Sequence, residues 1–244
     1  MKHILSIKGL EKKYGKKTVV KNISFSMESG QVIGLLGPNG AGKTTTFYMI
    51  VGFIKANGGR IFLDEKDITS LQMHKRAQEG LSYLPQEASI FRKLSVENNI
   101  KLVIENRDDL TESEQNQLLE KLLKDFGLTS LREQLGYTLS GGERRRTEIA
   151  RSLATSPHFL LLDEPFAGID PKAVYDIKQL IKDLSNKGIG ILLTDHNVRD
   201  TLSITDCSYI INNGSILTSG DKQTLLQDDM AREIYFGSTF EEEQ

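Results

Sequence analysis

Apolar and polar residues alternate along the start of the chain. Residues 4–8 and 19–27 carry apolar side chains at every second position, which predicts two half-buried antiparallel strands. Residues 31–36 are instead a continuous apolar run that ends in a glycine cluster, as in a strand buried on both faces. A helical pattern follows over residues 44–52. The residues after it predict two more short strands, at 61–63 and 80–84.

The middle of the chain has a different pattern. Residues 95–135 are mostly helix formers, and Thr111 with Glu114 forms a capping box that predicts a helix through Lys124 and a stop at Gly127. Helices and strands then alternate, which predicts a parallel sheet covered by helices. The expected elements are helices at 142–155 and 172–185, strands at 159–162, 189–193, 208–212 and 215–218, and a helical tail. The pattern indicates one α/β core with a helical part inserted into it.

Composition and charge exclude several classes of protein. The chain has 244 residues, with 31 basic against 33 acidic side chains, so its net charge of −2 gives no reason to expect nucleic acid as the main partner. A single cysteine, Cys207, excludes a disulfide framework and suits a reducing compartment. No apolar run approaches the roughly 20 residues that span a bilayer, and the first residues lack the apolar stretch of a signal peptide. We expect a soluble intracellular protein.

Residues 37–44 form a phosphate-binding motif. They read Gly-Pro-Asn-Gly-Ala-Gly-Lys-Thr and fit the pattern G-x-x-x-x-G-K-[ST] at every fixed position, between a predicted strand and a predicted helix. The glycines let several backbone N–H groups converge on one anion, and the helix N-terminus adds partial positive charge. We expect Lys43 to hold the β- and γ-phosphates and the Thr44 hydroxyl to bind Mg²⁺. The residues expected to contact the nucleotide here are Gly37, Pro38, Asn39, Gly40, Ala41, Gly42, Lys43, Thr44 and Thr45.

Two acidic residues, Asp163 and Glu164, follow the apolar run 159–162. They fall at the carboxyl end of a predicted parallel strand, the edge at which ligands gather in such sheets. Asp163 suits Mg²⁺ that keeps most of its waters, and Glu164 suits a general base for the attacking water. Helix capping is the alternative interpretation of this pair, and the phosphate-binding motif upstream favours the catalytic one.

Residues 139–143, Leu-Ser-Gly-Gly-Glu, predict a second anion site. Ser140 and Glu143 form a capping box, and Gly141 and Gly142 leave backbone N–H groups open at the start of a helix. An ordinary capped helix is the alternative. In a chain that already has a phosphate-binding loop, two half-sites suggest that ATP is shared between two copies packed head to tail.

Together these motifs resemble the ATPase subunits of ABC transporters. The phosphate-binding loop, a glutamine after a strand, the LSGG signature, the Asp-Glu pair and a histidine after the next strand all occur in the family's order. The resemblance implies that Gln86 senses Mg²⁺ and the water, that His196 contacts the γ-phosphate, and that residues 167–170 carry communication between the two copies. It also implies that Tyr14 stacks on adenine, with an ordinary core or surface tyrosine as the alternative.

The resemblance implies a fold and a set of partners as well. The fold is α/β, a P-loop NTPase ABC ATPase core with an antiparallel β subdomain and an inserted α-helical subdomain. One ABC ATPase domain covers 1–244, with the nucleotide-binding core at 1–87 and 156–244 and the helical subdomain at 88–155, ending in the signature helix. The implied cofactors are ATP and Mg²⁺, the implied partners are a second copy and two transmembrane subunits, and nucleic acid is not among them.

Four more specific stretches, at 44–50, 84–95, 140–146 and 195–199, are very similar to the ATPase subunits of bacterial lipopolysaccharide exporters. The similarity implies an ATP hydrolase that drives lipopolysaccharide export toward the outer membrane, working as a peripheral protein on the cytoplasmic face of the inner membrane. Phe91 and Arg92 are then expected to line a groove for a short helix of the membrane subunit. A core aromatic with a solvated arginine is the alternative for that pair.

Several other functions are alternatives to lipopolysaccharide export. The ATPase subunits of branched-chain amino-acid importers are the nearest alternative. An ABC ATPase acting on ribosomes or DNA is disfavoured by the single cassette and the lack of a basic excess, and a module that binds ATP without hydrolysing it is disfavoured by Glu164 and His196. Arg144–Arg146 are expected to form surface ion pairs, or Arg144 to touch nucleotide across the dimer. The last eight residues, 237–244, depart most from the family and receive no functional residue.

Overall fold

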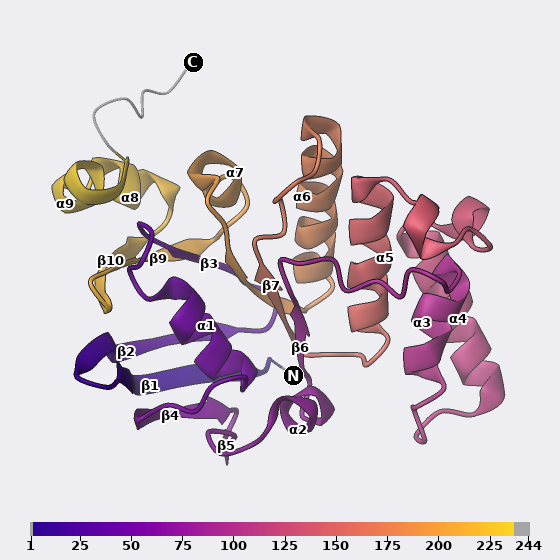
Figure 1. The fold of residues 1–244 in the computed structure, drawn as a ribbon, viewed down its shortest axis with the longest axis horizontal. Coiled ribbons are helices and arrows are strands. Elements are labelled where there is room, and N and C mark those ends of the chain that lie inside the picture. The colour runs from indigo at the N-terminus through magenta and orange to yellow at the C-terminus, as the bar shows by residue number, and fades with distance from the viewer. Residues whose placement is uncertain (1, 237–244) are drawn as a thin grey trace.

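Two β-sheets lie at the centre of the computed structural model, which describes residues 2–236 (Figure 1). The smaller sheet is antiparallel, with the order β2-β1-β4-β5, and the larger has the order β10-β9-β3-β8-β7-β6. In the larger sheet neighbouring strands are parallel except for β10, which is antiparallel to β9. The strands are β1 (Ile4–Tyr14), β2 (Lys17–Glu28), β3 (Val32–Leu36), β4 (Gly58–Leu63), β5 (Lys66–Asp67), β6 (Leu81–Leu84), β7 (Phe159–Asp163), β8 (Gly190–Thr194), β9 (Cys207–Asn212) and β10 (Ser215–Gly220).

The helices form groups around the larger sheet. In Figure 1, α3, α4 and α5 lie together at one side of the molecule, and α7, α8 and α9 lie at the other. The helices are α1 (Lys43–Val51), α2 (Met73–Gln78), α3 (Val96–Ile104), α4 (Glu112–Asp125), α5 (Gly141–Leu153), α6 (Pro171–Asn186), α7 (Val198–Leu202), α8 (Lys222–Gln227) and α9 (Asp229–Ala231). Short 3₁₀ turns occur at Thr129–Leu131 and Gly136–Thr138, and a π-helical turn at Arg232–Phe236.

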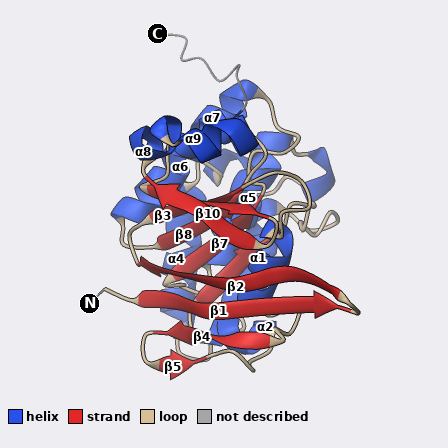
Figure 2. Cartoon of the chain, turned by 90° about the vertical axis from the view of Figure 1, so that its left-hand side faces the viewer, coloured by secondary structure: helices blue, strands red, loops and turns tan. Residues whose placement is uncertain are grey.

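The central strands separate two hydrophobic cores. Every residue of β3, β7 and β8 is buried, which explains their continuous apolar runs. Because side chains alternate between the faces of a strand, Leu161 packs with α1 and the antiparallel sheet, while Leu160 and Leu162 pack with α5 and α6. Figure 2 shows the antiparallel sheet below the strands of the larger sheet. Within the larger sheet Phe159 pairs with Gly190, and a Cβ on that glycine would lie 2.5 Å from the Phe159 ring.

The structure confirms the predicted α/β class and most predicted elements. The capping boxes at Thr111/Glu114 and Ser140/Glu143 form as expected and begin α4 and α5. Three elements were not predicted individually: β5, α2 and α7 have only two, six and five residues, too few to show a period. The boundaries of the helical subdomain, 88–155, stay a prediction, and the chain's last eight residues lie outside the described range.

A histidine clasp, formed by His3, Asp64 and His158, joins the two sheets. The rings of His3 and His158 stack with centroids 3.6 Å apart, and His3 Nδ1 lies 2.8 Å from Asp64 Oδ2. Asp64 also accepts a hydrogen bond from the N–H of Ile4 at 2.8 Å. Burial, with a smaller contribution from His3, lowers the pKa of His158, and the hydrogen bond with His3 lowers the pKa of Asp64. The neutral form of His158 is therefore favoured in the folded chain.

We expect the contribution of His158 to the stability of the folded chain to grow as the pH rises through acidic values to the ordinary histidine pKa of about 6.5. The pKa of His158 is lower in the folded chain than in the unfolded chain, so protonation of this histidine favours unfolding. The stabilisation that neutral His158 gives the folded chain is therefore complete above the ordinary histidine pKa of about 6.5 and is lost as the pH falls through the pKa of the folded chain. Thermal unfolding of the wild type and of His158→Gln across this range measures the effect, with the wild type losing more Tm toward low pH. Parallel pH profiles for the two proteins would contradict the clasp.

Candidate functional site

The loop between β3 and α1 forms a cradle of backbone N–H groups. Gly37 has φ 142°, and a Cβ there would lie 2.0 Å from the carbonyl oxygen of Ile211, so only glycine fits. Helix α1 begins after Gly42 with no side-chain cap, which leaves its first N–H groups available to an anion. The exposed residues Asn39 and Gly40 form the outer rim of the loop. The loop thus connects a buried strand to a helix, as the motif predicts, and its binding of phosphate stays a prediction.

Lys43 lies inside this loop. Its ammonium donates hydrogen bonds to the carbonyl oxygens of Gly37 at 2.6 Å and Pro38 at 3.1 Å, and only 7% of the residue is exposed. Burial lowers the pKa of Lys43, while the charge of Glu164 opposes that change. Thr44, directly after it, is exposed at the first turn of α1. The loop therefore holds a buried cation, with an exposed hydroxyl directly after it in sequence.

The two carboxylates stand at the carboxyl edge of the larger sheet. Asp163 ends β7, is buried, and accepts a hydrogen bond from the hydroxyl of Thr194, which ends β8, at 2.8 Å. Glu164 follows with φ 45°, an uncommon value for a residue with a side chain, and its N–H donates to the carbonyl oxygen of Thr194 at 2.9 Å. Such strained backbone is often found at functional sites.

The structure brings together the three residues predicted to be catalytic, each from the end of a different strand. Gln86 Nε2 donates a hydrogen bond to Glu164 Oε2 at 2.6 Å, and His196 Nε2 lies 2.6 Å from Glu164 Oε1. Burial raises the pKa of Glu164, Asp195 and Asp163 raise it further, and His196 opposes them. Both oxygens of the candidate base are thus engaged within one chain.

Buried Asp195 supports the backbone on both sides of this cluster. Its carboxylate accepts hydrogen bonds from the N–H groups of Phe166 at 3.1 Å and Asn197 at 2.8 Å. Burial raises the pKa of Asp195. Sequence reasoning did not single out this residue, although its place between Thr194 and His196 at a predicted strand end was a signal for it.

The signature residues lie at the start of α5, whereas the phosphate-binding loop leads into α1. Ser140 N donates to Glu143 Oε2 at 2.8 Å, and Glu143 N donates to Ser140 Oγ at 3.4 Å, which completes the predicted capping box. Among residues 2–236, no hydrogen bond or ion pair joins Ser140, Gly141 or Gly142 to loop residues 37–45. Within one chain the two predicted anion sites therefore share no polar contact, and their role in binding stays a prediction.

The remaining predicted contacts are on the surface. Tyr14 ends β1 with 51% of the residue exposed, and the Lys12 ammonium lies 5.1 Å from its ring centroid. Phe91 is 47% exposed, with the Arg151 guanidinium 5.1 Å from its ring. Arg92 lines a pocket of about 210 Å³ together with Ala88, Ile90, Gly136, Tyr137, Leu139 and Arg144. The ring of Phe91 is thus available to a partner, and its role stays a prediction.

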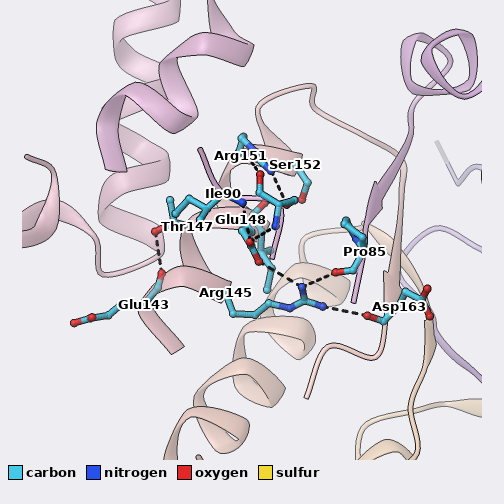
Figure 3. Close-up of polar contacts among 11 residues, drawn as sticks. Pro85, Ile90, Glu143, Arg145, Thr147, Glu148, Arg151, Ser152 and Asp163 are labelled. Carbon is cyan, nitrogen blue, oxygen red and sulfur yellow. Dashed lines mark hydrogen bonds and ion pairs between the residues drawn. The ribbon is translucent and has the colours of Figure 1, made fainter. Parts of the chain in front are cut away.

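The expectation of surface ion pairs for Arg144–Arg146 is wrong for Arg145. This residue is only 6% exposed, and its guanidinium pairs with buried Glu148 at 3.4 Å (Figure 3). It also donates hydrogen bonds to the carbonyl oxygens of Pro85 at 2.8 Å and Asp163 at 3.2 Å. The spacing to Glu148 and Ile149, three and four residues on, places all three on the buried face of α5. That spacing was the missed signal.

Comparison with known proteins agrees with this geometry. Residues 20–167 match the family model described as ABC transporter, so the loop, the glutamine, the signature and the acidic pair all fall inside the match. The chain belongs to the ABC transporter family, as an ATP-binding subunit that hydrolyses ATP. No helix within residues 2–236 combines the length and the apolar character needed to cross a membrane.

Individual relatives match nearly the whole chain. The Haemophilus influenzae protein named "Lipopolysaccharide export system ATP-binding protein LptB" is 49% identical over 237 residues, 97% of this chain and 98% of that protein. Its namesake in Acidithiobacillus ferridurans is 51% identical over 241 residues, covering 99% and 100%. Among solved structures, the ADP conformation of the ABC transporter cassette MJ1267 has a TM-score of 0.85 at 29% identity, covering 96% and 99%. The predicted ABC ATPase fold is therefore confirmed.

We expect Arg145→Ala to destabilise the chain by about 3 kcal/mol or more, because it leaves the Glu148 carboxylate buried without its cation. The adjacent Arg144→Ala is the matched control, and we expect it to change the free energy of unfolding by less than about 0.5 kcal/mol. Urea unfolding of the three proteins measures both values. Equal effects of the two substitutions would show that the buried ion pair has no special weight.

Proposed function

We propose that this chain is the ATP-hydrolysing motor subunit of a transporter that drives lipopolysaccharide export from the inner membrane toward the outer membrane. The observation that carries this proposal is its near-complete alignment, at about half identity, with relatives named as lipopolysaccharide export ATP-binding proteins. The cluster of Gln86, Glu164 and His196 adds the groups that hydrolysis needs. The same relatives disfavour the branched-chain amino-acid importer.

We assign the nucleotide to the cradle of residues 37–45, with its adenine at Tyr14. The uncapped start of α1 and the Lys43 ammonium fit a polyphosphate, since both offer positive charge at the same place. On binding, the phosphates take over the Lys43 ammonium from the loop carbonyls. Binding of the anion then replaces the two hydrogen bonds from Lys43 to the loop carbonyls with a contact between the ammonium and a charged phosphate. The affinity of the loop depends on the difference in free energy between these two sets of contacts.

The candidate Mg²⁺ site has the right donors and few of them. Thr44, Gln86 and Asp163 offer oxygen ligands, the type that Mg²⁺ prefers. Residues 2–236 contain no group of three or more His, Cys, Asp or Glu side chains able to hold a metal ion. A cation here would therefore complete its ligands with phosphate and water, as Mg²⁺ commonly does. When bound, it offsets the negative charge of the phosphates.

Glu164 is the group that we assign to proton transfer. Its carboxylate can accept the proton of the attacking water, and its raised pKa makes that carboxylate a stronger base than an ordinary glutamate. Gln86 and His196 each contact one of its two oxygens, and the second lone pair of either oxygen can accept a hydrogen bond from the water. His196 then turns to the γ-phosphate, and Lys43 stabilises the charge that develops there.

Two copies complete the site in this proposal. Ser140, Gly141 and Gly142 of one copy face the phosphate-binding loop of the other in a head-to-tail ATP-sandwich dimer, which suits their separation from that loop within one chain. The core, 1–87 with 156–244, and the helical subdomain, 88–155, then close together on ATP. Two transmembrane subunits then bind on the cytoplasmic face of the inner membrane, one at the Phe91 and Arg92 of each copy.

We expect Glu164→Gln to lower the rate of ATP hydrolysis by at least about 100-fold, because the amide cannot accept the proton of water. ATP binding should change little, since the cradle and Lys43 are untouched. Phosphate release and nucleotide affinity of the purified chain measure the two effects. Glu65→Gln, at an exposed position between β4 and β5, is the control that should keep the wild-type rate. Near-normal turnover by Glu164→Gln would remove Glu164 from the mechanism.

The transport assignment has its own test. The Glu164→Gln chain is purified with Mg·ATP from detergent-solubilised membranes, and the proteins that accompany it are identified. We expect two lipopolysaccharide-export membrane subunits, one of each for every pair of this chain. Amino-acid permease subunits would move the function to import and leave the nucleotide site unchanged. Recovery of ribosomes, or of no membrane protein, would refute the transporter role.

A further inference from the structure

The backbone of residues 89–91, called the 89–91 strip below, is held by side chains of the neighbouring helices. The N–H groups of Ser89 and Ile90 both donate to Glu148 Oε1 of α5, at 2.7 and 3.0 Å (Figure 3). The N–H of Phe91 donates to Asn99 Oδ1 of α3 at 2.8 Å. Three consecutive backbone donors that belong to no helix or strand thus have acceptors on the helical side of the molecule.

Carbonyl groups of the strip are bound in the same way. Arg151, also on α5, donates to the carbonyl oxygen of Ser89 at 2.9 Å and to its hydroxyl at 2.6 Å. Asn99 Nδ2 donates to the carbonyl oxygen of Phe91 at 3.1 Å, and Asn99 itself is fully buried. The exposed ring of Phe91 therefore sits on backbone that α3 and α5 fix at both ends.

Glu148 is central to this arrangement. It is only 2% exposed, and its second oxygen pairs with Arg145, which in turn binds the carbonyl oxygens of Pro85 and Asp163. Burying a carboxylate is costly unless its lone pairs are occupied, and here two backbone donors and a guanidinium occupy them. Removing Glu148 would leave those donors unpaired.

Helix α5 connects this carboxylate to the candidate nucleotide contact. Ser140 caps the start of the helix, and Glu148 lies eight residues further on, about 12 Å along the axis at 1.5 Å per residue. On the other side, residues 85–88 connect the strip to β6 without helix or strand. The strip is thus bound to α5 by hydrogen bonds from side chains, while its covalent connection to β6 is an irregular segment.

We propose that Glu148 is a positioning residue that makes the 89–91 strip move as one body with α5, so that a displacement of Ser140 reaches the surface formed by Phe91 and Arg92. This inference rests on the proposed function, because it takes the membrane subunit to bind at that surface. Glu148 is buried and acts through the backbone of Ser89 and Ile90.

The first test needs only the purified chain. Hydrogen exchange of residues 85–95 is followed in the wild type, Glu148→Ala, Glu148→Gln and the control Asp125→Asn, which removes an exposed ion pair with Lys187 at the end of α4. We expect exchange at Ser89 and Ile90 to rise at least about tenfold in Glu148→Ala and less in Glu148→Gln, whose amide oxygen can still accept. Exchange as slow as in the wild type in a folded Glu148→Ala chain would overturn the proposal.

The second test uses the complex with the membrane subunits. For Glu148→Ala we expect kcat and KM of the isolated chain within about twofold of the wild type, while transport per ATP hydrolysed falls at least about fivefold, and Glu148→Gln, which keeps an acceptor oxygen, should recover most of that transport. Asp125→Asn should keep both. A merely structural role would lower kcat and transport together, and that result would contradict the proposal. If the wild type recovers no membrane subunit, the proposed function fails, and the exchange experiment still decides the role of Glu148.

Discussion

Parallel strands all have their carboxyl ends at the same edge of the sheet. The candidate site of this protein depends on that constraint. The ends of β3, β6, β7 and β8 deliver the phosphate-binding loop, Gln86, the pair Asp163–Glu164 and His196 to one edge. None of these groups is close to another group in sequence except within the pair. Their contacts at 2.6 Å follow from the registers of strands that are themselves buried and apolar.

Charge is buried just behind this edge. Arg145 and Glu148 are surrounded by the sheet and the helices, and each uses the other and several backbone groups to satisfy its charge. Such a pair adds little net stability compared with an apolar replacement, but it imposes a specific geometry on what it touches. Here the pair contacts the end of β7, which carries Asp163, and the segment that carries Gln86 and Phe91. The candidate catalytic residues and the candidate surface for the membrane subunit are therefore held by the same ion pair.

Much of the fold and the site could be predicted because the signals are local. A glycine-rich loop between strand and helix, two capping boxes and an apolar strand ending in two acids each lie within a few residues, and the structure contains them all. The features that were missed depend on contacts between distant residues. His3 meets His158 across 155 positions, and Arg145 is buried by segments 60 residues before it and 18 after it. Spacing along one helix indicated the buried face, but its partners came from tertiary packing.

Strands that are apolar on both faces raise a question of alignment. In a half-exposed strand, a shift of the pairing register by one residue would expose the apolar side chains to water, which disfavours the shifted register. Strands β7 and β8 are buried throughout, so exposure to water does not select their register. The shape of the side chains selects the register instead, because the ring of Phe159 fits beside Gly190, where a residue with a Cβ would clash with it. Four residues further on, that same alignment sets Asp163 against Thr194. A hydrogen atom in place of a methyl group at one end of the sheet thus determines where the acidic group stands at the other.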